Sequence, residues 1–560
     1  MHCRCHRLKK QCIASVSARR HTTKRRGATR TNRLEEKLDE LVSRLKAHQD
    51  ARSKETEGEL NNPQDQGRIE PETGSLPAAL TPATAESLGG ATLTGVEKGS
   101  PDTGSVYLNE PPPAEAEELL KKFRDDAIGF FPFMYIPPHV TAQQLKELYP
   151  FLWLNIMCIA QSSPRERLSL SDQARNIVVQ RVVVNREKSL DLLLGLLALV
   201  GWAQRQRRER DKPFWTLFSQ LIVTLICDLG LHLPQSENLP TFCGLNAKNN
   251  DSRILNLFGT PTHEVQRAVL GAFFLTSRIS NIYKHAPGLR WSAQLDGYLE
   301  NIAQESTVSQ DEILIALVKM QLIINQLFDD SQTINGGRPP LYLSALRSQL
   351  LEITKPEKLG TVARNHPITL GLYHYTELLI SDSAISKPSV SWNEPDMRRF
   401  EIYQSCLLSI QAFLDTLFAT PVALLESLPF TSYPQIVHVV KALHKITTIQ
   451  DPAWDRNAVR KSIDLILTCD KVIATLEYLK ASATLASKDG SEDETYNWGL
   501  LIFRKQKEAW QNELDFIDAE SNTIGRETTM PRGIPHTGVA PPPEFGGDPW
   551  FSDMWNGFWE

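Results

Sequence analysis

The stretch from Ala114 to about Glu520 repeats apolar side chains at intervals of three and four residues. This interval places them on one face of an α-helix, whereas a half-buried strand needs an interval of two. The stretch shows no sustained strand-like alternation and no internal repeat of fixed period. We therefore predict a mostly α fold, in which residues 115–525 form a large all-helical domain.

Several expected helices have recognisable ends. Ser189 precedes the almost wholly apolar run 190–202, which predicts a central, buried helix. Ser309 and Glu312 have the spacing of a capping box, and Gly230 is suited to end a helix that follows Pro213. The other helices are expected within 119–130, 151–160, 264–283, 341–351, 370–379, 398–417, 436–443, 459–479 and 496–517.

Residues 1–33 are strongly basic. They contain eleven Lys or Arg and no Asp or Glu, a charge of +11; since the whole chain carries −5, the remainder carries −16. Such asymmetry is typical of an arm that binds a polyanion, because each phosphate neutralised releases a counterion. A solvated tail or an import signal, for example at 24–26, would have the same composition. The expected DNA contacts are Arg4, Arg7, Lys9, Lys10, Arg19, Arg20, Lys24, Arg25 and Arg26.

Three cysteines, Cys3, Cys5 and Cys12, lie in this basic segment, and six residues separate the last two. The run CHRLKKQC resembles half of a fungal zinc binuclear cluster. In this Zn2Cys6 family, two C-x2-C-x6-C halves hold two zinc ions. Thiolates bind zinc in a closed tetrahedron, and the metal replaces a core too small to fold alone. The resemblance implies a zinc cofactor bound by these three cysteines; incidental thiols are the alternative.

The segment departs from the family pattern in two ways. No cysteine follows Cys12 until Cys158, so the chain has at most half of the ligands, and Cys3 is one position nearer to Cys5 than the pattern requires. We therefore expect that the chain begins at an internal methionine. In the family the base-reading lysine lies in the first half and recognises CGG-type triplets in double-stranded DNA. Lys9 and Lys10 are then expected to contact mainly phosphates.

A short leucine heptad follows within residues 34–48. Its leucines are separated by four, three and four residues, which is the spacing of a coiled-coil seam. The seam is barely two heptads long, so we expect weak pairing. The resemblance implies a homodimer that joins two DNA-reading heads; an amphipathic helix docked on the body is the alternative. The seam residues are Leu34, Leu38, Leu41 and Leu45.

The flanks of the helical body are expected to be disordered. Residues 49–114 are rich in Pro, Gly, Ser, Thr and Glu and form the predicted linker. In the tail, 526–560, four acidic residues and six aromatic residues follow position 533, with no Lys or Arg. This mixture is typical of an activation segment that a coactivator groove accepts. A tail folded back to cap the core of the body is the alternative. The expected activation residues are Trp550, Phe551, Trp555, Phe558 and Trp559.

The body carries a second resemblance, to the middle homology region of fungal zinc-cluster regulators. It rests on the order of short motifs at 130–132, 150–154, 189–195, 228–231, 267–271 and 289–291. The resemblance implies an all-helical region that restrains activation, sometimes in response to small molecules. Packing explains each motif as well: Trp153 and Trp202 suit a core, and Arg290 beside Trp291 suggests a stacked or paired buried charge.

The remaining sequence features bear on other function classes. There is no G-x-S-x-G, P-loop, dinucleotide fingerprint or H-E-x-x-H motif, and the longest apolar run, 192–203, is far shorter than a bilayer requires. Eight scattered cysteines favour a reducing compartment. We predict a nuclear, non-enzymatic fungal regulator of RNA polymerase II genes. A regulator-derived protein that has lost DNA binding and acts through protein contacts is the main alternative, ahead of a helical enzyme or ligand carrier.

Overall fold

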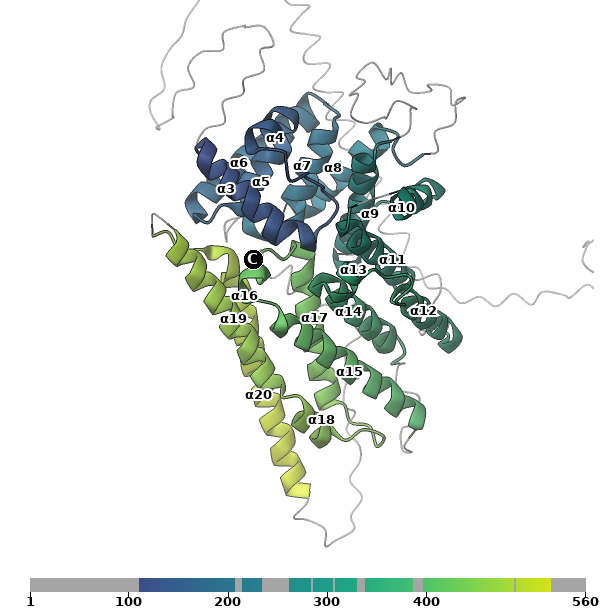
Figure 1. Ribbon diagram of the computed structural model, residues 1–560. Helices are drawn as coiled ribbons and strands as arrows, with labels where there is room; N and C mark the ends of the chain where they lie inside the picture. The colour runs from purple at the N-terminus through teal and green to yellow at the C-terminus, as the bar shows by residue number, and fades with distance from the viewer. Residues whose placement is uncertain are drawn as a thin grey trace, which may run out of the picture. The chain divides into compact units, whose positions relative to one another are not determined.

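The computed structural model describes residues 110–206, 214–233, 261–283, 286–305, 308–329, 338–385, 396–487 and 490–524. All of them belong to one unit of the chain, 102–560. Within these ranges the regular elements are helices, with no strand (Figure 1). The mostly α prediction is therefore confirmed for this part of the chain. The predicted zinc-cluster head, coiled coil and tail lie outside it, as does the predicted linker up to residue 109.

The first group of helices surrounds two that are apolar on all sides. Each residue of α7 is buried, and so is each residue of α5 after Pro150. As predicted, Ser189 caps α7, its hydroxyl accepting the Leu192 N–H at 3.2 Å. The elements are α3 Pro113–Lys122, continued by the π-helix Phe123–Ala127 and the 3-10 turn Ile128–Phe130, α4 Ala142–Leu148, α5 Pro150–Ala160, α6 Pro164–Ile177 with the π-helix Val178–Val184, α7 Leu190–Gly201, η4 Ala203–Gln206 and α8 Trp215–Asp228.

A second group continues the same hydrophobic core, which we call the first cluster and which runs from Ala116 to Ile380 and includes Phe430. Within this second group, helix α9 contributes the longest buried stretch, since each residue of Val265–Ile279 is buried. The group consists of α9 His263–Tyr283, α10 Ala293–Glu305, α11 Gln310–Phe328, α12 Pro340–Ile353, α13 Thr361–Asn365 and α14 Pro367–Ser383.

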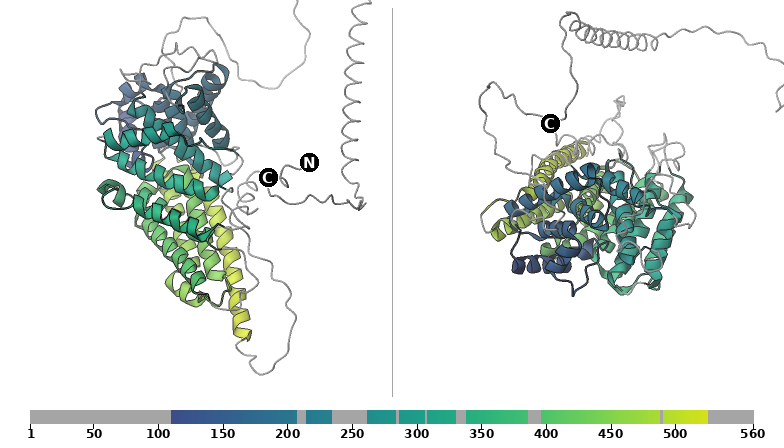
Figure 2. Two further views of the ribbon diagram at one scale, coloured as in Figure 1. Left: turned by 90° about the vertical axis from the view of Figure 1, so that its right-hand side faces the viewer. Right: turned by 90° about the horizontal axis from the view of Figure 1, so that it is seen from above.

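The last group forms the second cluster, whose apolar side chains lie mainly between Tyr403 and Leu514. Helices α14, α15 and α17 are successive neighbours, and α19 and α20 lie side by side along one edge (Figures 1 and 2). The elements are α15 Met397–Ala419, α16 Val422–Leu425, η6 Phe430–Ser432, α17 Tyr433–Thr448, α18 Arg456–Ser462, α19 Leu465–Ala486, η7 Glu494–Tyr496 and α20 Asn497–Ile524.

Helix α15 is, among the described residues, the one helix long and apolar enough to cross a bilayer. Its inner face contributes Tyr403, Ile410 and Phe413 to the second cluster. Its apolar composition therefore matches its place in the core of this fold.

Three local predictions are wrong. The helix expected over 459–479 is broken, because Asp464 caps a new helix, its carboxylate accepting the Leu467 N–H at 2.8 Å. Ser309 makes no side-chain cap, since its own backbone is already helical (φ −60°, ψ −29°). Arg290 is exposed and forms no buried pair with Trp291, whose ring N–H instead donates to Asp296 at 2.8 Å.

Candidate functional site

The residues that the sequence predicts to bind metal, DNA, a second chain or a coactivator lie at the two ends of the chain. The cysteines, the basic side chains and the heptad leucines fall in residues 3–45, and the activation residues fall in 550–559; all of these lie outside the described residues. Their roles therefore stay predictions. The described residues form a different candidate site, which was not among the sites predicted from the sequence.

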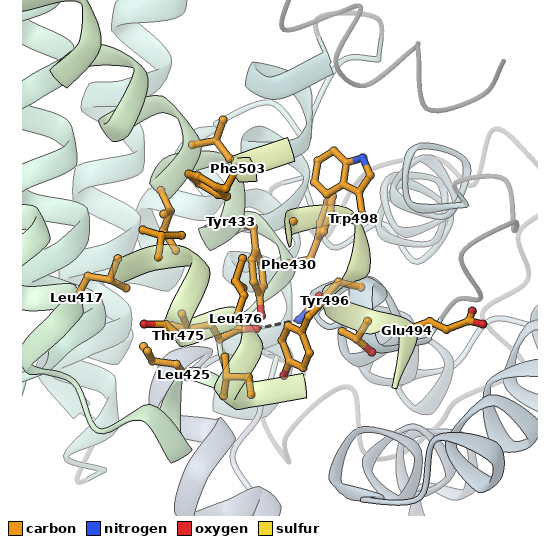
Figure 3. Close-up of a pocket in the computed structure, with 18 of the residues that line it drawn as sticks. Leu417, Leu425, Phe430, Tyr433, Thr475, Leu476, Glu494, Tyr496, Trp498 and Phe503 are labelled. Carbon is orange, nitrogen blue, oxygen red and sulfur yellow. Dashed lines mark hydrogen bonds between the residues drawn. The ribbon is translucent and has the colours of Figure 1, made fainter. Parts of the chain in front are cut away.

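A cavity of about 120 Å³ lies among the C-terminal helices, where the two hydrophobic clusters meet (Figure 3). Its walls come from η4, α8, the end of α15, α16, η6, α17, α19, η7 and the start of α20. The lining is almost entirely apolar and includes several aromatic rings. The ring-bearing residues are Trp215, Phe418, Phe430, Tyr433, Tyr496, Trp498 and Phe503.

Contacts between helices shape this cavity. Phe430 in η6 belongs to the first cluster and lies against the α8 residue Trp215, with ring centres 4.8 Å apart. On the opposite wall Gly499 in α20 faces α19, where a Cβ atom would come within 3.2 Å of Leu476 Cδ1. Glycine at position 499 thus keeps the two helices close while leaving the cavity open.

One largely buried ion pair and one hydrogen bond hold the cavity wall to η4. Arg205 beside the wall residue Gln204 donates to the Glu426 carboxylate at 2.7 Å, and the Gln204 amide donates to the Leu428 carbonyl at 3.0 Å. Burial by itself raises the pKa of Glu426, but the positive charges of Arg205 and Lys122 outweigh burial and lower it below its ordinary value. Glu426 is therefore ionised, and the pair fixes α16 to η4.

The two tyrosines that line the cavity keep their protons at neutral pH. Burial raises the pKa of Tyr433 to about 12, and burial also raises the pKa of Tyr496 well above its ordinary value. Neither phenol can then act as a base. Among the described residues no group of His, Cys, Asp or Glu has the arrangement of a metal site. The site suits the binding of an apolar group.

Two of the described histidines contact other side chains. His438 contacts the Tyr375 hydroxyl at 3.0 Å, and His444 pairs with Glu513 at 2.9 Å. The four described cysteines are free thiols. Burial raises the pKa of Cys158 to about 12, and its thiol donates to the Arg167 carbonyl at 3.2 Å. Cys158 is therefore a protonated core residue and no candidate for completing the predicted zinc cluster.

This cavity could hardly be predicted from the sequence. Its lining residues are spread from Gln204 to Phe503, and each wall segment reads by itself as an ordinary amphipathic helix face. The aromatic residues Phe430, the first residue of η6, and Trp498, the second residue of α20, are a local signal. They indicate burial and do not reveal a shared space.

Comparisons with known proteins bear on the function. A family model described as a C-terminal domain, ATEG07667_C, matches residues 422–556. The chain is 27% identical over 521 residues to the transcription factor opdL of Penicillium oxalicum, covering 90% of this chain and 84% of the relative. The chain resembles fungal transcription factors.

Two further relatives are also named as transcription factors. A transcription factor of Aspergillus terreus is 24% identical over 529 residues, covering 86% of this chain and 79% of the relative. Transcription factor himD of Aspergillus japonicus is 25% identical over 215 residues, covering 38% of this chain and 34% of the relative. No solved structure matches. The names of the relatives support a fungal transcription-factor family and favour a regulator over an enzyme.

Proposed function

We propose that this protein is a nuclear regulator of RNA polymerase II genes that binds double-stranded DNA through its N-terminal segment. The proposal is carried by the likeness to transcription factor opdL over 90% of this chain. The charge of +11 within residues 1–33 supports DNA as the partner, since phosphate contacts supply most of the affinity of such segments. The helical body then controls what the bound protein does.

In this proposal the head binds zinc through Cys3, Cys5 and Cys12, and thiolate sulfur suits this metal. Leu34 to Leu45 pair two chains into a homodimer, which sets two heads on neighbouring half-sites of the CGG type. Zinc analysis of the purified chain tests the metal. A zinc content that does not fall when the three cysteines are changed to serine contradicts this role.

Salt dependence tests DNA binding. The affinity of the full chain for duplex DNA should fall steeply with salt, with a logarithmic slope of about −0.9 for each phosphate neutralised. Replacing Lys9 and Lys10 by glutamine should reduce this slope by about 2, whereas the same change at the exposed helical residues Arg504 and Lys505 should leave it unchanged. A flat salt response of the unaltered chain contradicts the proposal.

We propose that the tail recruits a coactivator through Trp550, Phe551, Trp555, Phe558 and Trp559. Support comes from its acidic charge and closely spaced aromatic residues, which suit capture by an apolar groove. Residues 533–560 fused to an unrelated DNA-binding domain should activate a reporter, and Trp555→Ala together with Trp559→Ala should abolish the output. Output that survives both substitutions contradicts this role of the tail.

One observation favours a second candidate, a regulator that has lost sequence-specific DNA binding and works through protein contacts. The chain holds three cysteines near the predicted cluster, and the next one along, Cys158, is buried in α5 and bonded to a backbone carbonyl. Reading the genomic sequence just upstream of Met1 for a C-x2-C-x6-C half distinguishes the two candidates. Such a half favours specific DNA binding, and its absence favours protein contacts.

A further inference from the structure

We propose that the aromatic segment of the tail, residues 550–559, docks on the same chain with the ring of Trp555 in the apolar cavity and Phe551 beside it. Docking would bury the side chains that are proposed above to meet a coactivator, so the tail would be masked until it is released. The docking itself rests on the cavity, and its regulatory meaning rests on the proposed function.

The cavity is suited to bind an apolar ring that makes few hydrogen bonds. Its lining is almost wholly apolar, and its volume of about 120 Å³ is near the ~150 Å³ of a protein cavity that binds benzene. Figure 3 shows Phe430, Tyr433 and Phe503 around this space. Rings in such surroundings gain from edge-to-face and offset contacts in addition to burial. One aromatic side chain is therefore the best-matched occupant.

The tail offers such side chains at a suitable spacing. Residues 545–560 hold six aromatic residues, and Phe551 and Trp555 are four positions apart. On a helix this spacing puts both rings on one face, so that Phe551 lies beside Trp555 when Trp555 enters the cavity. The segment also carries Asp548 and Asp553. The cavity lining includes one acidic residue, Glu494. A charge of opposite sign to the tail comes from the exposed Lys471, whose ammonium group is 5.6 Å from the centre of the lining ring of Phe418.

The chain is long enough for this return. The cavity lies at the start of α20, at Trp498 and Gly499, and α20 spans 28 residues, about 42 Å at 1.5 Å per residue. Trp550 follows Ile524 by 26 residues, which can reach up to about 85 Å when extended. The tail can therefore come back along α20 with length to spare. Tethering also raises the effective concentration of the segment at the cavity.

The matched family domain covers both most of the cavity wall and the aromatic segment of the tail. The matched C-terminal domain begins at Val422, the first residue of α16, and continues to Asn556. It thus includes most of the cavity wall together with Phe551 and Trp555. If the tail acted only as a free activation segment, the family domain that forms the cavity could end before it. Docking gives a physical reason for the continuity.

Hydrogen exchange in the full chain tests docking. Amides of residues 548–558 should exchange at least tenfold more slowly than in the isolated peptide 545–560. Thr475→Trp, which fills the cavity from α19, should remove this protection. The matched control Tyr478→Trp places the same ring three residues away on the exposed side of α19, at a residue that is 61% exposed, and should keep the protection.

Two further variants keep the test decisive if Thr475→Trp does not fold. Gly499→Leu fills the cavity from α20, and Trp555→Ala removes the anchor without touching the body. Full chain carrying Trp555→Ala should bind added labelled peptide 545–560 at least tenfold more tightly than the unaltered chain does, because its own tail no longer competes.

Three results would overturn docking. These are tail amides that exchange at the peptide rate in the unaltered chain, protection that survives in a folded cavity-filled variant, and a small apolar molecule found in the cavity by native mass spectrometry while the tail is unprotected. The activation role fails separately, through a silent reporter fusion of residues 533–560. Protection of the tail with a silent fusion would uphold docking and reject the activation role.

Discussion

Arg167 in α6 donates to the Asp493 carboxylate at 2.7 Å, although the two residues are 326 positions apart, and each side chain is only 2% exposed. The same guanidinium donates to the Arg205 carbonyl at 2.9 Å. The pair ties the first group of helices to the segment that enters η7 and lines the cavity. This part of the wall is therefore held from the opposite end of the described chain.

Replacing Asp493 by alanine should destabilise the protein by about 3–5 kcal/mol, because the charge of Arg167 would stay buried without its partner. Urea unfolding followed by circular dichroism measures this change. Asp470→Ala is the control, since Asp470 pairs with Lys507 at a site where the aspartate is 47% exposed, and its loss should cost less than about 1 kcal/mol. Equal effects of the two substitutions would contradict the assignment.

Gly195→Ala should destabilise the protein by about 1–3 kcal/mol through overpacking. Gly195 lies in α7, where a Cβ atom would be 2.2 Å from the Cδ1 atom of the buried ring of Phe151 in α5. In the same helix Gly201 has no atom within 4 Å of such a Cβ, so Gly201→Ala should be neutral or slightly stabilising. Thermal unfolding of both variants checks the prediction, and the reverse order of melting temperatures would refute it.

Arg267→Lys should cost about 2 kcal/mol even though the charge is kept. Arg267 in α9 donates through Nε and Nη2 to the two oxygens of Asp311 in α11, at 2.8 and 2.7 Å. A lysine cannot reproduce this fork. The control is Arg504→Lys, whose pair with Glu477 is more than half exposed on the arginine side. A loss of stability in the control as large as that of Arg267→Lys would argue against the fork as the cause.

His438 should make the protein less stable as the pH falls. Burial lowers the pKa of His438 in the folded chain to about 4, below the ordinary 6.5. Between these two values the unfolded chain takes up a proton that the folded chain does not, so stability is complete above about pH 6.5 and declines toward pH 4. The loss from pH 7 to pH 5 should be about 2 kcal/mol.

The variant His438→Gln should lack this part of the pH dependence in urea unfolding at pH 7 and pH 5. His139→Gln changes an exposed histidine and should retain the full dependence. If both variants behave like the unaltered protein, a different group is responsible for the loss of stability.

Much of the helical architecture could be predicted because it depends on neighbours along the chain. The runs that became α5 and α7 are apolar on every side, and a helix of that kind is stable only when fully buried. The break between Ser462 and Leu465 was missed because two interrupted helices and one continuous helix have nearly the same periodicity. At this point the start of the second helix depends on a single capping carboxylate, that of Asp464.

By itself, then, the sequence determined the helical class, the buried helices and the placement of charge, with a basic start and an acidic remainder. Only the tertiary structure decided which helices meet, that Arg167 pairs with Asp493, and that Trp215, Phe430 and Trp498 line one cavity. The physical reason is that periodicity specifies which face of a helix must leave water. The partner that covers this face is selected by close packing and charge pairing between residues hundreds of positions apart.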